Sequence, residues 1–479
     1  MSDDSTNISR TIFRAAKWLG GAQVMSNLCS IILNKLVALW IGPIGMGLFS
    51  IYNATIDMLR SATSLGLRQS SVRDIALADE SHDDRQLARM VAVVRRWAWF
   101  ISLFGAITTM ALAPLLSRWS FGDSSHLWHF VALSAALLLL GFTHCELSIL
   151  QGTERIKRLA WASLSGTVIG LLLSIPLFYF FREDSILLSV IAYHVALFGS
   201  AWFFRHKGVA KEKVSNKEAI REGATFVRLG LFMTLSEFVT MLSTYIFSAY
   251  LNRTAGTEIV GFYQSGYSLI GRYVALILTA LGTEFYPRLS KVCTSHLRTR
   301  VFVAQEINII MLCMLPFVSL FLLCREWIVW LLYTSEFHVI IPYISWAIVG
   351  CVLRAFSWFM AYTIIAKGDG KTYLFTESLS VVIGFLLNVI CYNVWGLEGL
   401  GIAFMLWYAF YCLIIAIVYS IIYKYTLPIP TLILSLSVFC LMLGLKQMLD
   451  FGLIIPSIIV TLLLTAASIT RLRKILRHK

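Results

Sequence analysis

Long apolar runs follow one another along almost the whole chain, and they constrain the fold more than any single motif does. A helix that crosses a membrane needs about 20 mostly apolar residues, and the sequence contains fourteen runs of about this length. Inside a membrane each backbone polar group must be paired within its own structure. The runs therefore predict an all-α polytopic membrane protein with about 14 transmembrane helices. They are 16–41, 45–67, 95–117, 127–150, 159–181, 185–204, 226–251, 259–286, 302–324, 339–366, 373–395, 398–423, 431–449 and 452–470.

The distribution of basic residues between the runs predicts the topology. With the N-terminus in the cytoplasm, 31 of the 40 Lys and Arg residues fall on inner segments and five fall on outer loops. Cytoplasmic loops of membrane proteins collect Lys and Arg, so both termini are predicted to be cytoplasmic. The net charge of +14 has the same origin, and we expect no nucleic-acid partner.

Two stretches with similar spacing indicate an internal repeat. Gly47 begins a Gly-Leu-Phe motif and Gly261 a Gly-Phe-Tyr motif, and each is followed by an arginine near the middle of an apolar run, Arg60 and Arg272. The spacing corresponds to a period of about 213 residues and predicts two halves of six runs each in the same orientation, a parallel repeat. The predicted division is 1–212 and 213–425, each a six-helix bundle, and 426–479, two additional C-terminal helices with a basic tail.

The loops exclude several functional classes. Every predicted outer loop is short, and the longest inner segments are 68–94 and 205–225. No catalytic domain fits in any of them, so we expect no enzyme activity and no catalytic residues. Residues 327–333 are predicted to form a short interfacial helix, since Trp and Tyr favour the headgroup level.

Four basic residues fall inside the apolar runs, and they are the candidate binding residues: Lys35, Arg60, Arg272 and Arg354. A charge at mid-bilayer costs about 2.5–3.5 kcal/mol on insertion scales, so such residues usually face a cavity or a partner. Arg272 and Arg354 have no carboxylate within four residues. By contrast, Arg60 can pair with Asp57 at i, i+3, and Lys35 can extend to the headgroups.

Several Arg and Lys side chains in a membrane cavity favour an anionic ligand. Guanidinium matches phosphate oxygens in a bidentate geometry and stays charged, so four converging cations would neutralise a pyrophosphate. Tyr263 and Tyr267 lie one to two helical turns before Arg272. They are candidates for hydrogen bonds to a sugar, and ordinary helix packing is the alternative.

Acidic residues inside the runs are candidates for coupling transport to a proton or sodium ion: Asp57, Glu146 and Glu237. His144 and His194 are expected to be packed or hydrogen-bonded, because their spacing does not suggest a metal site. The nine cysteines show neither CxxC spacing nor a pairing pattern, which argues against zinc and against a disulfide framework. We expect no metal and no cofactor.

Four motifs resemble the multidrug/oligosaccharidyl-lipid/polysaccharide (MOP) superfamily, and within it the O-antigen and enterobacterial-common-antigen lipid-carrier translocases. They are IGPIGMGLFS (41–50), GFYQSGYSLI (261–270), FYPRLSK (285–291) and IIAKGDGKTY (364–373). The resemblance implies two six-helix bundles in a V around a central cavity. It also implies a flippase that moves undecaprenyl-pyrophosphate-linked oligosaccharide to the outer leaflet of the bacterial cytoplasmic (inner) membrane, with cavity cations on the pyrophosphate.

The resemblance also implies partners and a role for the last two runs. The partners are the undecaprenyl-pyrophosphate-linked glycan and membrane lipid, with a polysaccharide polymerase and chain-length machinery as further candidates. In the related lipid II flippases an additional helix pair forms a groove for the lipid tail, which makes 431–470 a candidate for the same role.

Three other functions stay open. A cation-coupled multidrug exporter of the same superfamily should favour carboxylates over arginines in its cavity. A membrane glycosyltransferase or polysaccharide polymerase usually needs sizeable outer loops or a soluble domain. A scaffold for the glycan machinery leaves the internal cations unexplained.

Overall fold

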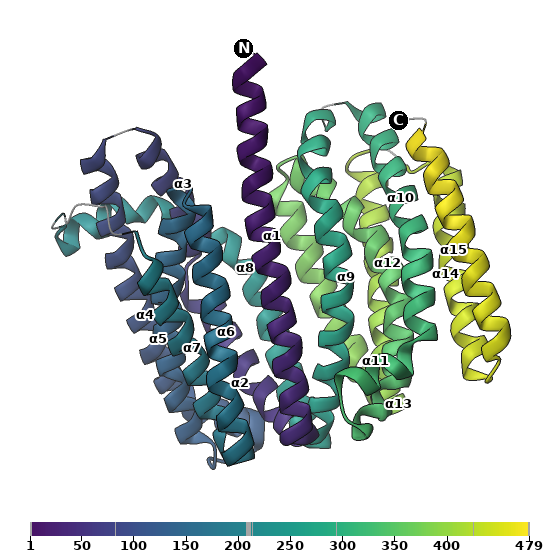
Figure 1. The fold of residues 1–479 in the computed structure, drawn as a ribbon, viewed down its shortest axis with the longest axis horizontal. Helices are drawn as coiled ribbons and strands as arrows, with labels where there is room; N and C mark the ends of the chain where they lie inside the picture. Colours follow the sequence, from purple (N-terminus) through teal and green to yellow (C-terminus); the bar gives the residue numbers. More distant parts are fainter. Residues whose placement is uncertain are drawn as a thin grey trace. The chain divides into compact units, whose positions relative to one another are not determined.

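The computed structural model describes residues 2–81, 83–206, 212, 214–293, 295–424 and 426–477. Within helices it leaves out the side chains of 2–17, 19, 69, 224–233, 272–277, 279–284, 286–287, 290–291 and 475–477. The described residues form helices joined by short turns, and they contain no strand (Figure 1). The predicted all-α polytopic membrane fold is confirmed.

The chain divides into two compact units, Met1–Gly261 and Phe262–Lys479. The predicted division at 212 and 425 stays a prediction, and the contacts group α8 with the first unit. The helices of the first unit are α1 (Ser2–Trp40), α2 (Gly42–Thr63), α3 (Leu67–Glu80), α4 (Asp84–Phe121), α5 (Leu127–Gly152), α6 (Ile156–Phe181), η1 (Arg182–Ser185), α7 (Ile186–Phe204) and α8 (Asn216–Ala255).

The second unit contains the remaining helices, and α9 begins in the first unit and continues into the second. They are α9 (Thr257–Val292), α10 (His296–Leu323), α11 (Arg325–Leu332), η2 (Ser335–Ile340), α12 (Ile341–Ala366), α13 (Gly370–Ile421), α14 (Ile429–Asp450) and α15 (Ile454–Arg477).

Each of the fourteen predicted runs falls on a helix to within a few residues. Among the described residues, nine stretches are long and apolar enough to cross a membrane. Two of these, Ile156–Phe204 and Gly370–Ile421, each contain two predicted runs. The helix α11 forms at the predicted short segment, whereas α3 lies in the inner segment 68–94, for which no helix is predicted.

Glycines set two sharp turns at the ends of helices. Gly42 has φ 73° and turns the chain from α1 into α2. Gly396 has φ 60° and ψ −140° and separates the two halves of α13. L side chains rarely adopt such backbone angles, which explains how two apolar runs follow each other almost without a loop.

The two glycines of the predicted internal repeat pack against backbone. A side chain on Gly47 would overlap the carbonyl of Thr257, and one on Gly261 would overlap the carbonyl of Pro43. The first turns of α2 and α9 therefore approach each other as closely as two backbones can.

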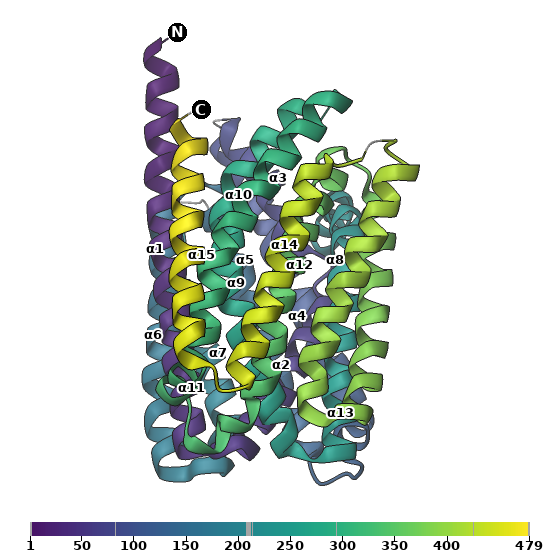
Figure 2. The same cartoon turned by 90° about the vertical axis from the view of Figure 1, so that its right-hand side faces the viewer.

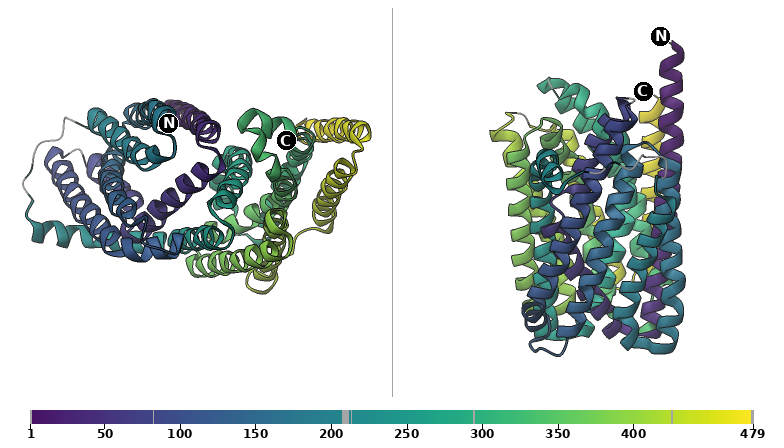
Figure 3. Two further views of the ribbon diagram at one scale, coloured as in Figure 1. Left: turned by 90° about the horizontal axis from the view of Figure 1, so that it is seen from below. Right: turned by 90° about the vertical axis from the view of Figure 1, so that its left-hand side faces the viewer.

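Most helices of the first unit run side by side, and the first part of α8 runs across them (Figures 1 and 3). The helix α8 packs against α2, α3 and α4. In the second unit α12 packs against α10, α13 and α14, and the C-terminal pair α14 and α15 packs against α10 (Figure 2).

Candidate functional site

The first unit contains a polar cavity of about 420 Å³ within its helices. Residues of α2, α3, α4, α5, α7 and α8 line it. Its charged and titratable lining residues include Asp57, Arg60, Arg68, His144, His194 and Glu237. The cavity therefore brings together one of the predicted cations and two of the predicted coupling carboxylates.

Arg60 is the centre of an ion-pair cluster in this cavity. Its Nη2 donates to Oε1 of Glu237 at 2.7 Å, and its Nε lies 3.6 Å from Oδ1 of Asp57. The expected i, i+3 pairing with Asp57 is present. The closer partner, however, is Glu237 on α8, 177 residues away in the sequence.

Arg68 also lines the cavity, and it belongs to the inner segment 68–94, for which no binding residue is predicted. It is the second residue of α3, two positions after the left-handed Gly66 (φ 66°) that turns the chain out of α2. The Arg68 side chain is exposed and has no hydrogen bond or ion pair among the described residues. The cavity therefore contains one paired and one unpaired arginine.

The two histidines of the apolar runs both line the cavity. His194 Nδ1 lies 2.8 Å from the carbonyl oxygen of Val190, so the expected hydrogen bond is present. Among the described residues, no group of three or more His, Cys, Asp and Glu side chains is arranged to hold a metal ion.

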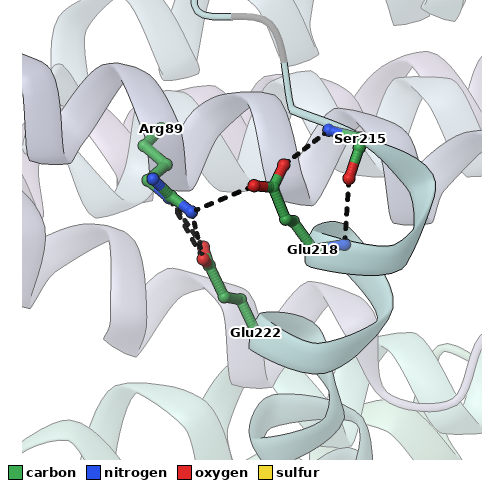
Figure 4. A network of polar contacts seen from close by, with 4 residues as sticks. All are labelled: Arg89, Ser215, Glu218 and Glu222. Atoms are coloured by element: carbon green, nitrogen blue, oxygen red, sulfur yellow. Dashed lines mark hydrogen bonds and ion pairs between the residues drawn. The ribbon is translucent and has the colours of Figure 1, made fainter.

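The beginning of α8 is fixed to α4 by a polar network (Figure 4). Arg89 binds Glu222 with both Nε and Nη2, at 3.1 and 2.6 Å, and Glu218 lies 4.0 Å from the same guanidinium. Ser215 and Glu218 form a reciprocal capping box, in which each satisfies a backbone N–H of the other.

Trp97 completes this anchor. Its indole N–H donates to the carbonyl of Ala219 at 2.8 Å, and its ring occupies the space where a side chain on Gly223 would lie. We call Ser215 to Gly223 with Arg89 and Trp97 the α8 anchor. It holds the first turns of α8 in one place.

Glu146 lies on α5 and binds Arg95 of α4. The two hydrogen bonds measure 2.9 and 3.0 Å, and the Glu146 side chain is only 5% exposed. Bidentate arginine–carboxylate pairs are strong and geometrically specific. The pair joins α4 to α5, and a coupling role for Glu146 stays a prediction.

In the second unit, Arg354 and the predicted tyrosines lie in an aromatic cluster. The guanidinium carbon of Arg354 is 5.7 Å from the centre of the Tyr408 ring, within range for a cation–π interaction. The Tyr263 ring lies 5.8 Å from Tyr267 and 6.1 Å from Tyr343. Arg354 has no carboxylate partner among the described residues.

A half-buried carboxylate of α13 is also held by a tyrosine. Glu377 accepts a short hydrogen bond from the hydroxyl of Tyr411. Tyr411 is buried and lies one helical turn after Tyr408. Within the described part of the second unit, Glu377 forms no ion pair.

The structure does not place two of the predicted binding residues, Lys35 and Arg272, in a cavity. Lys35 is exposed on α1 and is not among the described residues that line the first-unit cavity. Arg272 lies on α9, but its side chain is outside the described residues.

The C-terminal helix pair borders a second, mainly apolar groove of about 740 Å³. Leu312 and Leu315 of α10, Ile433 and Leu441 of α14 and Leu464 of α15 line it, with Arg471 among its polar residues. The groove is lined by α10 together with both C-terminal helices, and a role of 431–470 in holding a lipid tail stays a prediction.

Comparisons with known proteins agree with this architecture. The sequence profile of a family described as "Polysaccharide biosynthesis protein" matches residues 12–293. The chain is 21% identical over 373 residues to the lipid III flippase of Escherichia coli (strain K12), covering 77% of this chain and 88% of the relative. A lipid III flippase of Shigella flexneri matches to the same extent.

Solved structures show the fold. The lipid II flippase MurJ in an inward closed conformation superposes with a TM-score of 0.73 at 14% identity, covering 96% of this chain and 99% of that one. An inward-facing multidrug resistance MATE family transporter of the MOP superfamily gives 0.69 at 14% identity, covering 81% and 92%. The chain has the fold of these transporters, and the predicted MOP resemblance is confirmed.

Proposed function

Because the chain belongs to the polysaccharide biosynthesis protein family, we propose that it is a flippase that carries a lipid-linked oligosaccharide across the bacterial inner membrane. The observation that carries this proposal is a polar cavity with arginines inside a bundle of membrane-spanning helices. Cations inside membrane-spanning bundles are costly unless they face a cavity or a partner. A phosphate-linked headgroup is such a partner.

The specific substrate we propose is an undecaprenyl-pyrophosphate-linked glycan of the O-antigen or common-antigen type. Arg60, Arg272, Arg354 and Lys35 bind its pyrophosphate, and Tyr263 and Tyr267 bind sugar hydroxyls. Guanidinium suits this ligand because it presents a planar fork of donors to phosphate oxygens. The cation–π contact of Arg354 with Tyr408 supports the assignment, because it orients a guanidinium that no described carboxylate neutralises.

The proposed mechanism is alternating access with both termini in the cytoplasm. The headgroup enters from the cytoplasmic side and leaves on the outer side, while the polyprenyl tail stays in lipid. The mainly apolar groove between α10, α14 and α15 is the proposed seat of the tail. No covalent step is required, so the protein needs no catalytic residue or cofactor.

The membrane potential is a sufficient driving force. Moving one elementary charge across 100 mV is worth about 2.3 kcal/mol, and a headgroup with about two negative charges gains roughly twice that on leaving a negative interior. Coupling to a proton or sodium ion through Asp57, Glu146 or Glu237 is the proposed addition to this force.

The test is leaflet-to-leaflet movement of a fluorescent undecaprenyl-pyrophosphoryl sugar in reconstituted vesicles, with and without an imposed potential. We expect wild type to flip the lipid and Arg272→Ala/Arg354→Ala to lose at least about tenfold in rate, since a charge-assisted hydrogen bond is worth about 1.5–3 kcal/mol. Arg253→Ala, at an exposed arginine near the end of α8, is the matched control.

Two outcomes would contradict the proposal. Flipping at the wild-type rate in the double variant would show that Arg272 and Arg354 do not form the pyrophosphate site. No flipping by wild type, together with efflux of lipophilic cations, would favour the multidrug exporter, for which the carboxylates Asp57 and Glu237 in the first-unit cavity are the structural argument.

A further inference from the structure

Arg60 is already neutralised in the first-unit cavity. Two carboxylates flank its guanidinium, Glu237 at 2.7 Å and Asp57 at 3.6 Å. A phosphate that takes the Nη2 position of Arg60 must therefore displace Glu237. A substrate phosphate and Glu237 therefore compete for the same guanidinium N–H groups.

The two carboxylates differ in what their bonds connect. Asp57 lies on the same helix as Arg60, one turn away, and its pairing distance is the longer one. Glu237 lies on α8, and its bond joins α8 to α2. Exchange of Glu237 for a phosphate would break a link between two helices, whereas exchange of Asp57 would not.

The second arginine of the cavity is open to a ligand. Arg68 is exposed, lines the same cavity as Arg60 and Glu237, and has no ion pair among the described residues. Both cavity carboxylates, Asp57 and Glu237, contact Arg60, and neither contacts Arg68. An incoming anion therefore meets no carboxylate in direct contact with Arg68, although the charge of Glu237 acts on this arginine.

We propose that Glu237 is a resident counter-anion, which occupies at Arg60 the place that a substrate phosphate takes, and that Arg68 is the cation that first receives this phosphate. The inference rests on the proposed function and deepens it by assigning these two residues. A phosphate group carries more charge than a carboxylate and accepts more hydrogen bonds, so together with Arg68 it can replace Glu237.

The exchange acts on the middle of α8. The α8 anchor holds the beginning of this helix on α4. Near its other end, Tyr245 bonds to Ser120 at 2.9 Å and Asn252 donates to the Ser120 carbonyl at 2.7 Å. Glu237 lies between these two fixed regions, so its release from Arg60 removes a polar link between the central part of α8 and α2 while the hydrogen bonds near both ends remain.

The test is binding of undecaprenyl pyrophosphate, without sugar, to the purified full-length protein in nanodiscs, with undecaprenol as the uncharged comparison. Glu237→Gln should bind undecaprenyl pyrophosphate about tenfold more tightly, because the competitor has lost its charge. Glu222→Gln is the matched control: it lies on the same helix, is ion-paired and is similarly exposed, at 26% against 29%, but it does not line the cavity.

The Arg68 arm tests the receiving residue. Arg68→Ala should bind about tenfold more weakly, Arg68→Lys should recover part of the affinity, and Arg73→Ala, an exposed arginine of the same helix, should bind as wild type does. Because Arg68 is exposed, we expect its replacement to disturb packing little. The Arg68 variants therefore test the inference even if Glu237→Gln lowers the stability of the protein.

A double variant separates exchange from a general change in charge. In an Arg60→Ala background the gain from Glu237→Gln should disappear. If the gain persists, or if Glu237→Gln and Arg68→Ala bind as their controls do, the inference is wrong while the proposed function stands. If wild type binds undecaprenyl pyrophosphate no better than undecaprenol, the proposed function itself fails.

Discussion

Charges within the apolar helices are arranged differently in the two units. In the first unit, arginines meet carboxylates: Arg60 binds Glu237, and Arg95 binds Glu146 through two hydrogen bonds. In the second unit, Arg354 and Glu377 meet tyrosines instead, while Asp450 at the end of α14 pairs with Arg325 and Lys446. Arg354 lies over the ring of Tyr408, and Glu377 accepts from the hydroxyl of Tyr411.

The difference determines what each region can do with a charged ligand. A salt bridge inside a helix bundle must be broken before either partner can bind something else, and breaking it leaves an uncompensated charge. A charged side chain that contacts a tyrosine is oriented by a neutral group, so its charge is not neutralised. The first unit is therefore suited to exchange of partners, and the second to direct attraction.

The sharpest test of this contrast removes one member of a first-unit pair whose carboxylate is buried. Arg95→Ala leaves the Glu146 side chain, which is only 5% exposed, without its partner. Breaking a buried ion pair costs about 3–5 kcal/mol, and since Arg95 itself is 38% exposed we expect the lower end of this range. Unfolding of the purified protein in detergent measures the loss.

The neighbouring arginine is the control for that experiment. Arg96 forms a longer hydrogen bond, 3.4 Å, to the carbonyl of Val214, so Arg96→Ala should cost clearly less. Equal losses for the two variants would show that the carboxylate pairing in the first unit does not set its stability.

A smaller effect is expected where a tyrosine holds the charge. Tyr411→Phe removes the hydroxyl that Glu377 accepts from and should lower the free energy of unfolding by about 1–2 kcal/mol. Tyr408→Phe keeps the ring beneath Arg354, so it should change stability by less. The contrast between the units would be lost if both variants behaved alike in the same unfolding assay.

The smallest effect is expected at the water-exposed charges of the α8 anchor. Hydrogen bonds from the backbone and hydroxyl of Ser215 lower the pKa of Glu218. A carboxyl whose folded pKa is lowered stabilises the fold above its unfolded pKa, about 4.3, and this contribution is lost as the pH falls through the folded value. The difference in melting temperature between wild type and Glu218→Ala should therefore be largest at neutral pH.

Below about pH 4 the same gap should shrink. Glu183→Ala, at an exposed carboxylate of η1, is the comparison. A gap that is constant between pH 7 and pH 3 would mean that the charge of Glu218 contributes nothing to the anchor.

The elements that depend on local sequence were predictable, and those that depend on distant contacts were not. Length and hydropathy are sufficient to place the apolar helices. The helix α3 was missed because its sequence, LRQSSVRDIALADE, is short and polar, and it is held by packing against α4, α5 and α8. The Asp57–Arg60 pair follows from helical spacing.

The contact of Arg60 with Glu237 spans 177 residues, so no local pattern indicates it. Arg68 was missed for a related reason. It follows directly on an apolar run and counts there as one more inner charge, and only the turn at Gly66 directs it to the cavity. In the sequence, the signal for this turn is Gly66, because glycine readily adopts the positive φ found there.

The close approach of Gly47 and Gly261 bears on which changes the chain tolerates. The two glycines occupy equivalent places in the predicted internal repeat, and a side chain on either would overlap backbone at the start of the other helix. A methyl group at one position would push apart the same two helix starts as a methyl group at the other. The two sites are therefore under one shared steric constraint, although they lie far apart in the sequence.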